Sequence, residues 1–446
     1  MRKIIALFFG MLLTLLPVNA NQISKFLNSQ HLHVSAISIS IKDVETGQVI
    51  YALNDRIPRN PASTLKLLTA YAAYNTLGDD YKFSTKLYKT AKNELYLKLG
   101  ADPFLTSADL NRMMNTAKSK NINEPKSVNI DNTIFDAVEW GEGWQWDDDL
   151  NPLMPRFGAY NLDGNLLNIE VTSQGKNRAP SITSKPYYPV TFMNMLTVKD
   201  SNNVKLERNN NISPNIINVT GTIESRQVLQ IPVNNLQLYF NLRLTDALRA
   251  AKIEYYNPFY ITKLPNQVYL VDEVNHDINQ VMNCILKNSS NLCAESLYKV
   301  AGSVYAGTPG SIENSTAMLN DYLNSFGLTP SEIKIVDGSG VSKNNIMTSD
   351  FMTNYLMKIS KTDNFDKIKS FMVTPGEGTL NNRMLYFKSN LWAKTGTLSD
   401  NSAIAGYIKN RRGKLYAFDI MIQNAKTSEA DKKNIEEQIL RIIYEY

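Results

Sequence analysis

Residues 61–73 read PASTLKLLTAYAA, a short polar opening followed by an apolar run. A proline just ahead of such a run favours the first turn of a helix, so we expect a buried helix from Leu65 to Ala73. Ser63 then lies at the N-terminal end of this helix, and Lys66 lies one turn later on the same face. A serine needs a base to become a nucleophile, and burial lowers the pKa of a lysine, so the pair is a candidate nucleophile and base. The same spacing recurs from three other serines and is weak evidence alone: Ser173, Ser296 and Ser331.

A second candidate element is Lys394-Thr395-Gly396-Thr397, near the C-terminus. It follows an apolar triplet and precedes two alternating segments joined by a tight turn, so we expect it on a strand. A glycine there lets a substrate backbone approach the strand closely. Lys394 and Thr395 beside it would hold an anion. The pattern K-T-G occurs once in the chain, which makes it moderately specific.

A third element is Ser342-Lys343-Asn344, which follows the glycine-rich stretch 337–340. S-x-N alone means little, since it also occurs at Ser127 and Ser213. The three elements carry weight together, because serine–lysine, S-x-N and K-T-G come in this order on an expected helix, loop and strand. Such a set is typical of serine enzymes that react with penicillin. A Ser-His-Asp hydrolase is disfavoured, since no G-x-S-x-G elbow is present.

The N-terminus has the pattern of a sorting signal. Arg2 and Lys3 form a basic start, residues 4–16 are apolar or small, and small residues precede a cleavage site after Ala20. The apolar run is too short to span a membrane comfortably as a permanent helix. We therefore expect a cleaved signal peptide over residues 1–20 and a periplasmic protein without a stable transmembrane anchor. An uncleaved N-terminal anchor is the alternative.

Composition excludes several classes of function. The 446 residues carry a net charge of +5, which falls to +3 without Arg2 and Lys3, so a nucleic-acid partner is not expected. Three histidines and two cysteines argue against a metal site, and we expect no cofactor. Cys284 and Cys293 can pair in an oxidising compartment, but isolated cysteines are often simply buried thiols, so the sequence leaves this open.

The chain is expected to divide into three parts. Strands are predicted over 34–41 and 48–53, ahead of the first helix, and residues 80–265 are rich in Asn, Pro and short strand-like runs. The remaining predicted elements are helices over 277–287, 291–304, 313–325, 348–360 and 427–444, and strands over 402–409 and 414–422. We therefore assign 21–80 and 266–446 to a catalytic domain and 81–265 to inserted β-rich domains, two in number, with one nested in the other.

With these elements in place, the sequence resembles the D-alanyl-D-alanine carboxypeptidase/endopeptidase family, the class C low-molecular-mass penicillin-binding proteins. Four further segments resemble family motifs: 99–103 (LGADP), 143–148 (GWQWDD), 290–295 (SNLCAE) and 378–383 (GTLNNR). The resemblance implies an α/β (α+β) fold, with a penicillin-binding transpeptidase/β-lactamase-like core. In that core an antiparallel sheet is flanked by helices, and the inserted β-rich domains are additional.

The resemblance also implies a mechanism. Neutral Lys66 takes the proton of Ser63, which attacks a D-Ala-D-Xaa bond in a peptidoglycan stem peptide. Ser342 relays a proton to the leaving amine, and Asn344 orients Lys66. Lys394 and Thr395 bind the substrate carboxylate, while the backbone N–H groups of Ser63 and Thr397 form the oxyanion hole.

β-Lactam antibiotics then act as covalent inhibitors, because their ring-opened amine cannot leave. Relatives use an aspartate and an arginine to bind the diamino-acid side chain, and these resemble Asp148 and Arg383. Two other readings remain, a β-lactamase and a non-catalytic peptidoglycan-binding scaffold. The balance of carboxypeptidase and endopeptidase activity and the oligomeric state stay open.

Overall fold

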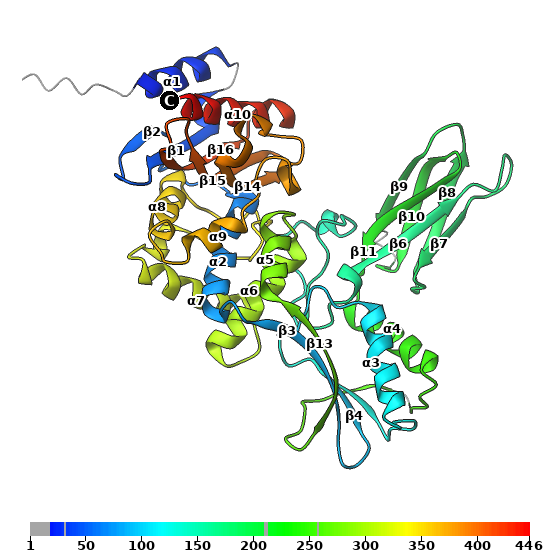
Figure 1. Cartoon of the computed structure of the whole chain (residues 1–446). Helices are drawn as coiled ribbons and strands as arrows, with labels where there is room; N and C mark the ends of the chain where they lie inside the picture. The colour runs from blue at the N-terminus through cyan, green and yellow to red at the C-terminus, as the bar shows by residue number, and fades with distance from the viewer. Residues whose placement is uncertain (1–17, 31–32, 209–212, 257) are drawn as a thin grey trace, which may run out of the picture.

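The computed structural model describes residues 18–30, 33–208, 213–256 and 258–446. The apolar run of the predicted signal peptide, residues 4–16, lies outside them. The described chain begins with helix α1 (Val18–Ser29), which runs through the predicted cleavage site. Figure 1 shows a main body that contains both ends of the described chain, and two lobes that extend from it on one side.

A five-stranded antiparallel sheet forms the centre of the main body. Its strands, in spatial order, are β14 (Leu391–Leu398), β15 (Asn401–Lys409), β16 (Leu415–Gln423), β1 (Ile37–Asp43) and β2 (Val49–Leu53). In β1 the isoleucines 37, 39 and 41 pack with α1 and α10 (Glu429–Glu445) on one face. Ser40 points to the other face, where its hydroxyl hydrogen-bonds Thr353 at 2.7 Å. The strand expected here is present, with both of its faces buried.

Helices cover the second face of the sheet (Figure 1). Helix α2 (Lys66–Leu77) is enclosed by its neighbours, and residues 66–74 are all buried. This explains its uniformly apolar sequence, since a helix surrounded by protein needs no polar face. The other helices of this layer are α5 (Ile278–Leu286), α6 (Asn291–Ala306), α7 (Ile312–Ser325), α8 (Ser349–Ile359) and α9 (Phe365–Ser370).

The segment between α2 and α5 forms the two lobes (Figure 1). One lobe contains the sheet β12-β5-β4-β3-β13, made of β12 (Tyr260–Ile261), β5 (Val128–Asp131), β4 (Leu95–Lys98), β3 (Lys82–Lys89) and β13 (Tyr269–Asp277). Helices α3 (Ser107–Ser119) and α4 (Leu236–Ala250) pack with it.

The second lobe consists of two three-stranded sheets, β11-β6-β7 and β8-β10-β9. Their strands are β6 (Leu166–Thr172), β7 (Ser181–Lys185), β8 (Thr191–Val198), β9 (Asn203–Arg208), β10 (Ile216–Ile223) and β11 (Arg226–Pro232). In the first lobe, Asp277 pairs with Lys82, so the chain leaves the main body and returns to it through adjacent ends of β3 and β13. Residues 269–277, which the sequence assigned to the catalytic domain, thus lie in the sheet of the insertion.

No helix within the described ranges is long and apolar enough to cross a membrane.

A carboxyl group is buried in the middle of the main sheet. Asp419 lies on β16 with 1% of its surface exposed, and neither of its carboxylate oxygens has a hydrogen-bond partner among the described residues. Burial raises the pKa of Asp419 to about 8, against the effect of the nearby Ser349 hydroxyl and helped by the Glu436 carboxylate. Between the ordinary pKa near ~3.9 and 8, the folded state therefore binds a proton that the unfolded chain has lost.

We expect Asp419→Asn to change the pH dependence of stability. In the wild type, the contribution of Asp419 to the free energy of unfolding falls by about 1.4 kcal/mol for each unit that the pH rises between roughly 5 and 7. The asparagine variant should lack this contribution, which urea unfolding at several pH values measures. Substitution of an exposed aspartate, Asp363→Asn, is the matched control and should leave the slope unchanged. An Asp419→Asn variant with the wild-type slope would contradict the prediction.

Candidate active site

Ser63 lies in a tight turn at the start of α2. The 3-10 helix η2 (Ala62–Leu65) leads directly into α2, and Ala62 has a positive φ of 48°. The loop at Gly340 packs beneath this turn, so closely that a Cβ on Gly340 would lie 2.0 Å from the Ala62 carbonyl oxygen. The loop after residue 336 therefore fixes the backbone that presents Ser63.

Lys66 is fully buried, and its side chain points back to the serine. Its Nζ donates hydrogen bonds to Ser63 Oγ at 2.8 Å, to Asn291 Oδ1 at 2.7 Å and to the Ser339 carbonyl at 2.6 Å. Burial lowers the pKa of Lys66 to about 8, although the carboxylates of Asp337 and Glu295 act in the opposite direction. A substantial fraction of the lysine is neutral at slightly alkaline pH, as a general base requires.

The two buried acids hold the loop that faces Lys66. The Glu295 carboxylate accepts hydrogen bonds from the backbone N–H groups of Gly338 and Ser339 at 3.0 and 2.8 Å. Burial raises the pKa of Glu295 to about 7, and Asp337 adds to the rise. Asp337 accepts four hydrogen bonds, from the Gly340 and Ser342 backbone N–H groups, from Asn345 Nδ2 and from Trp144 Nε1. The Ser339 carbonyl is thereby aimed at Lys66.

The K-T-G element lies on β14, beside the nucleophile, as predicted for its secondary structure. Lys394 is fully buried and donates to Ser289 Oγ at 2.8 Å and to the Thr395 carbonyl at 2.7 Å. Burial lowers its pKa well below the ordinary lysine value, and the charge of Lys66 lowers it further. A Cβ on Gly396 would lie 2.9 Å from the Ser63 backbone nitrogen, so this glycine lets β14 lie directly against the turn of the nucleophile.

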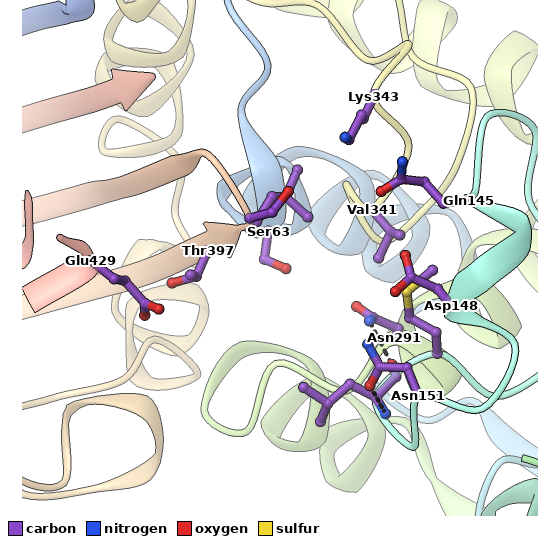
Figure 2. Close-up of a pocket in the computed structure, with 13 residues that line it drawn as sticks. Ser63, Gln145, Asp148, Asn151, Asn291, Val341, Lys343, Thr397 and Glu429 are labelled. Carbon is purple, nitrogen blue, oxygen red and sulfur yellow. Dashed lines mark hydrogen bonds between the residues drawn. The ribbon is translucent and has the colours of Figure 1, made fainter. Parts of the chain in front are cut away.

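A pocket of about 350 Å³ opens above Ser63. Figure 2 shows Thr397 and Glu429 on one side of it and Gln145 and Asp148 on the other. The remaining lining residues are Asn151, Leu153, Met154, Asn291, Val341, Lys343, Leu398 and Ser399. Ser63, Thr397 and Asp148, three of the predicted site residues, thus face one cavity.

Ser342 and Asn344 do not make the contacts predicted for them. Ser342 is fully buried, and its Oγ accepts a hydrogen bond from the Asn344 backbone N–H at 3.1 Å. The Asn344 side chain donates to Glu142 at 3.3 Å, away from Lys66. The lysine reaches Asn291 instead, so the S-x-N assignment to residues 342–344 is corrected. The physical reason is that Ser342 lies in a turn of the loop after residue 336. Its backbone N–H donates to Asp337, and its hydroxyl accepts from the Asn344 backbone.

Arg383 also lies away from the pocket. Its guanidinium forms an ion pair with Glu436 of α10 at 2.9 Å, and Glu436 is itself buried. The pocket has a positive charge from a different residue, Lys343, whose side chain is exposed. The predicted use of Arg383 for a substrate carboxylate is therefore not supported by its position.

Sequence reasoning missed Ser289 and Asn291 as site residues. They form another S-x-N pattern, Ser289-Ser290-Asn291, at the N-terminus of α6, where the Ser290 hydroxyl caps the helix. The segment 290–295 had been noted as a family-like helix start, without a role for its asparagine. The position of this S-x-N at a helix start could have indicated a site. Such a start presents the serine and the asparagine together at one end of a rigid element.

Comparisons with known proteins agree with this geometry. The D-Ala-D-Ala carboxypeptidase 3 (S13) family model matches residues 19–446. The D-alanyl-D-alanine carboxypeptidase DacB of Haemophilus influenzae is 25% identical over 447 residues, which cover 94% of this chain and 91% of the relative. A D-alanyl-D-alanine carboxypeptidase of Actinomadura sp. (strain R39) is 24% identical, over 90% of this chain and 80% of the relative.

Solved structures show the same fold. The crystal structure of penicillin binding protein 4 (dacB) from Haemophilus influenzae matches with a TM-score of 0.83 and 24% identity, covering 95% of this chain and 99% of that one. The same protein complexed with a novel β-lactam gives a TM-score of 0.78 at 23% identity, covering 96% of this chain and 100% of that one. The predicted fold class is confirmed, and the chain belongs to the D-Ala-D-Ala carboxypeptidase 3 (S13) family.

Proposed function

We propose that this chain is a serine-type D-Ala-D-Ala carboxypeptidase that acts through an acyl-enzyme on Ser63 and is acylated by β-lactams. One observation carries the proposal: a fully buried lysine, with a pKa lowered to about 8, lies 2.8 Å from a serine hydroxyl at the floor of a pocket. Family membership gives the reaction class, and this geometry gives the chain's own means of performing it.

Acylation begins when neutral Lys66 takes the proton of Ser63 as its Oγ attacks the carbonyl carbon of the D-Ala-D-Xaa bond. Asn291 and the Ser339 carbonyl hold the lysine nitrogen in place. Lys394 donates a hydrogen bond to Ser289, two residues before the Asn291 that contacts Lys66, and the Ser289 hydroxyl relays a proton to the leaving amine. This role replaces the one first assigned to Ser342.

The developing oxyanion is stabilised by backbone N–H groups. Those of Ser63 and Thr397 are the candidates, because Gly396 keeps β14 against the nucleophile turn. Lys394 is fully buried on β14 and acts on the substrate carboxylate through its charge. Thr397 lines the pocket, whereas the buried Thr395 donates its hydroxyl to Thr379 at 2.8 Å. Water then hydrolyses the ester and returns Ser63.

The leaving group decides which bond is hydrolysed. A terminal D-alanine makes the reaction a carboxypeptidase step, and the D-centre of a cross-linking diamino acid makes it an endopeptidase step. We propose both activities for the one site, since the pocket is open at the surface above Ser63. We further propose that the chain is exported to the periplasm, that 1–20 is its signal peptide, and that the insertion is formed by two domains.

The first prediction concerns the nucleophile. Ser63→Ala should abolish covalent labelling by a fluorescent penicillin, because no other hydroxyl is hydrogen-bonded to Lys66 in the described residues. Labelling is measured on denaturing gels, with thermal unfolding to show that the variant is folded. Ser399→Ala, at the rim of the same pocket, is the control and should label normally. A folded wild type that is not labelled would sink the mechanism and favour a wall-binding scaffold, whereas rapid turnover of a chromogenic cephalosporin would indicate a β-lactamase.

The second prediction separates the two S-x-N assignments. Asn291→Ala should lower the second-order rate constant of acylation about 100-fold, because Lys66 loses the hydrogen bond that orients it. Asn344→Ala should change the same constant by less than about threefold. Stopped-flow acylation with a chromogenic β-lactam measures both. The reverse ranking would restore the original assignment.

The charges of the pocket suggest how the substrate side chain is recognised. Asp148 and Lys343 both line the cavity, and they have opposite signs. We propose that Asp148 binds the ammonium and Lys343 the carboxylate of a diamino acid in the stem peptide, in place of Arg383. Hydrogen bonds between charged partners of this kind discriminate well against neutral side chains.

The third prediction tests this recognition. Asp148→Asn and Lys343→Met should each lower kcat/KM about tenfold for a stem peptide with a zwitterionic side chain. Neither should affect a D-Ala-D-Ala peptide whose side-chain amine is acetylated and whose side chain has no carboxylate, which serves as the internal control. Equal losses on both peptides would mean that these residues shape the pocket and do not read the side-chain charge.

A further inference from the structure

The loop that carries Ser289 and Asn291 is bracketed by the two cysteines of the chain. Cys284 lies in the last turn of α5 and Cys293 in the first turn of α6. Their sulfur atoms are 2.7 Å apart. A disulfide bond is about 2.05 Å long, so a shift of well under 1 Å would join them.

Backbone contacts also close the base of this loop. The Ser290 N–H donates to the Cys284 carbonyl, and the Cys293 N–H donates to Ser290 Oγ, each at 3.2 Å. Ser289 has a positive φ of 61°, a conformation that a serine rarely adopts. Both cysteines are thus hydrogen-bonded to Ser290. Its neighbours in the sequence contact the two lysines: Ser289 accepts from Lys394, and Asn291 accepts from Lys66.

We propose that Cys284 and Cys293 form an intramolecular disulfide that braces the loop and positions Asn291 against Lys66. The positioning part rests on the proposed function, in which Lys66 is the base. Covalent closure of the loop restricts the arrangements open to residues 285–292 and favours the one in which both lysines have their partners.

The reaction that forms this bond balances with a disulfide oxidant, RSSR, such as oxidised glutathione or a thiol–disulfide exchange protein. The Cys284 thiolate attacks one sulfur of RSSR, which gives a mixed disulfide and releases RS⁻. Cys293, after loss of its proton, attacks the Cys284 sulfur and releases the second RS⁻. Two protein thiols are oxidised, one RSSR is reduced to two RSH, and both protons pass to the released thiolates.

The surroundings suit this order of attack. A cavity of about 440 Å³ is lined by both cysteines and by residues 288–292, and Cys284 is partly exposed, so a small disulfide has access. The hydrogen bond with Cys293 lowers the pKa of Cys284, while burial raises that of Cys293. The accessible cysteine is therefore the better nucleophile, and the buried one completes the bond.

Oxidation also removes two titratable thiols near the base. The thiolate form of Cys284, whose pKa is lowered, raises the pKa of Lys66, as the carboxylates of Asp337 and Glu295 do, and Lys394 is the cation whose charge interacts with Lys66. A disulfide is uncharged, so Lys66 should lose its proton at lower pH in the oxidised chain. The pH dependence of acylation reports this change, which a purely structural brace would not produce.

The experiment compares the full chain after oxidised glutathione with the same preparation after dithiothreitol. Because the chain has two cysteines, thiol titration after unfolding should count none in the oxidised form and two in the reduced form. Peptide mapping should recover Cys284 linked to Cys293 within one chain. Two remaining thiols after oxidation, or a link between chains, would overturn the disulfide.

Acylation by a chromogenic β-lactam then tests positioning. The oxidised form should react about threefold faster at pH 7, with the pH midpoint about 0.5 unit lower than in the reduced form. In Cys284→Ser the two treatments should give one identical profile. Identical profiles in the wild type would overturn the positioning role. The thiol count decides the disulfide even if penicillin labels neither form, a result that would count against the proposed function alone.

Discussion

Two lysine ammonium groups share one buried site, and this constraint organises the structure around them. Lys66 and Lys394 are fully enclosed, and neither takes part in an ion pair within the described part of the chain. Their partners are neutral oxygens, from two serine hydroxyls, the carbonyls of a serine and a threonine, and an asparagine amide. An unpaired buried ammonium readily gives up its proton, so the surroundings that are costly for folding are those that suit Lys66 to the proposed role of base.

The acids of the site are placed one layer further out. The carboxylates of Glu295 and Asp337 accept hydrogen bonds from backbone N–H groups of the loop after residue 336. Within the described residues they form no ion pair with either lysine. That loop supplies the Ser339 carbonyl to Lys66 and the Gly340 contact to the turn of Ser63. A single layer of buried carboxylates therefore determines the positions of both nucleophile and base.

Much of this could be predicted from the sequence, because the decisive signals are local. The apolar run after Lys66 indicated a buried helix, the isoleucine alternation in 37–41 indicated a half-buried strand, and K-T-G before a hairpin indicated a strand. All three elements are present, but β1 is buried on both faces because helices cover both sides of the sheet. The resemblance to the family, the fold class and the class of enzyme are likewise confirmed by the family match and the structural neighbours.

The errors arose where tertiary contacts choose between equal patterns. Ser289-x-Asn291 and Ser342-x-Asn344 look alike in sequence, and only the packing of α6 against α2 brings the first to Lys66. Arg383 had the right charge for a substrate carboxylate, but Glu436 on α10, more than fifty residues later, holds its guanidinium. Long-range pairings of this kind leave no periodic signal in one sequence.

The insertion is connected to the main body through one end of the β3–β13 pair, yet it is not a separable attachment. Gln145 and Asp148 form one wall of the pocket, and the Leu153 carbonyl accepts the hydrogen bond from the Asn291 side-chain amide at 2.7 Å. Trp144 reaches further, to the carboxylate of Asp337. Loss of the inserted segment during evolution would therefore leave the Asn291 side-chain amide without this partner. We expect the insertion and the Ser63 pocket to have evolved together.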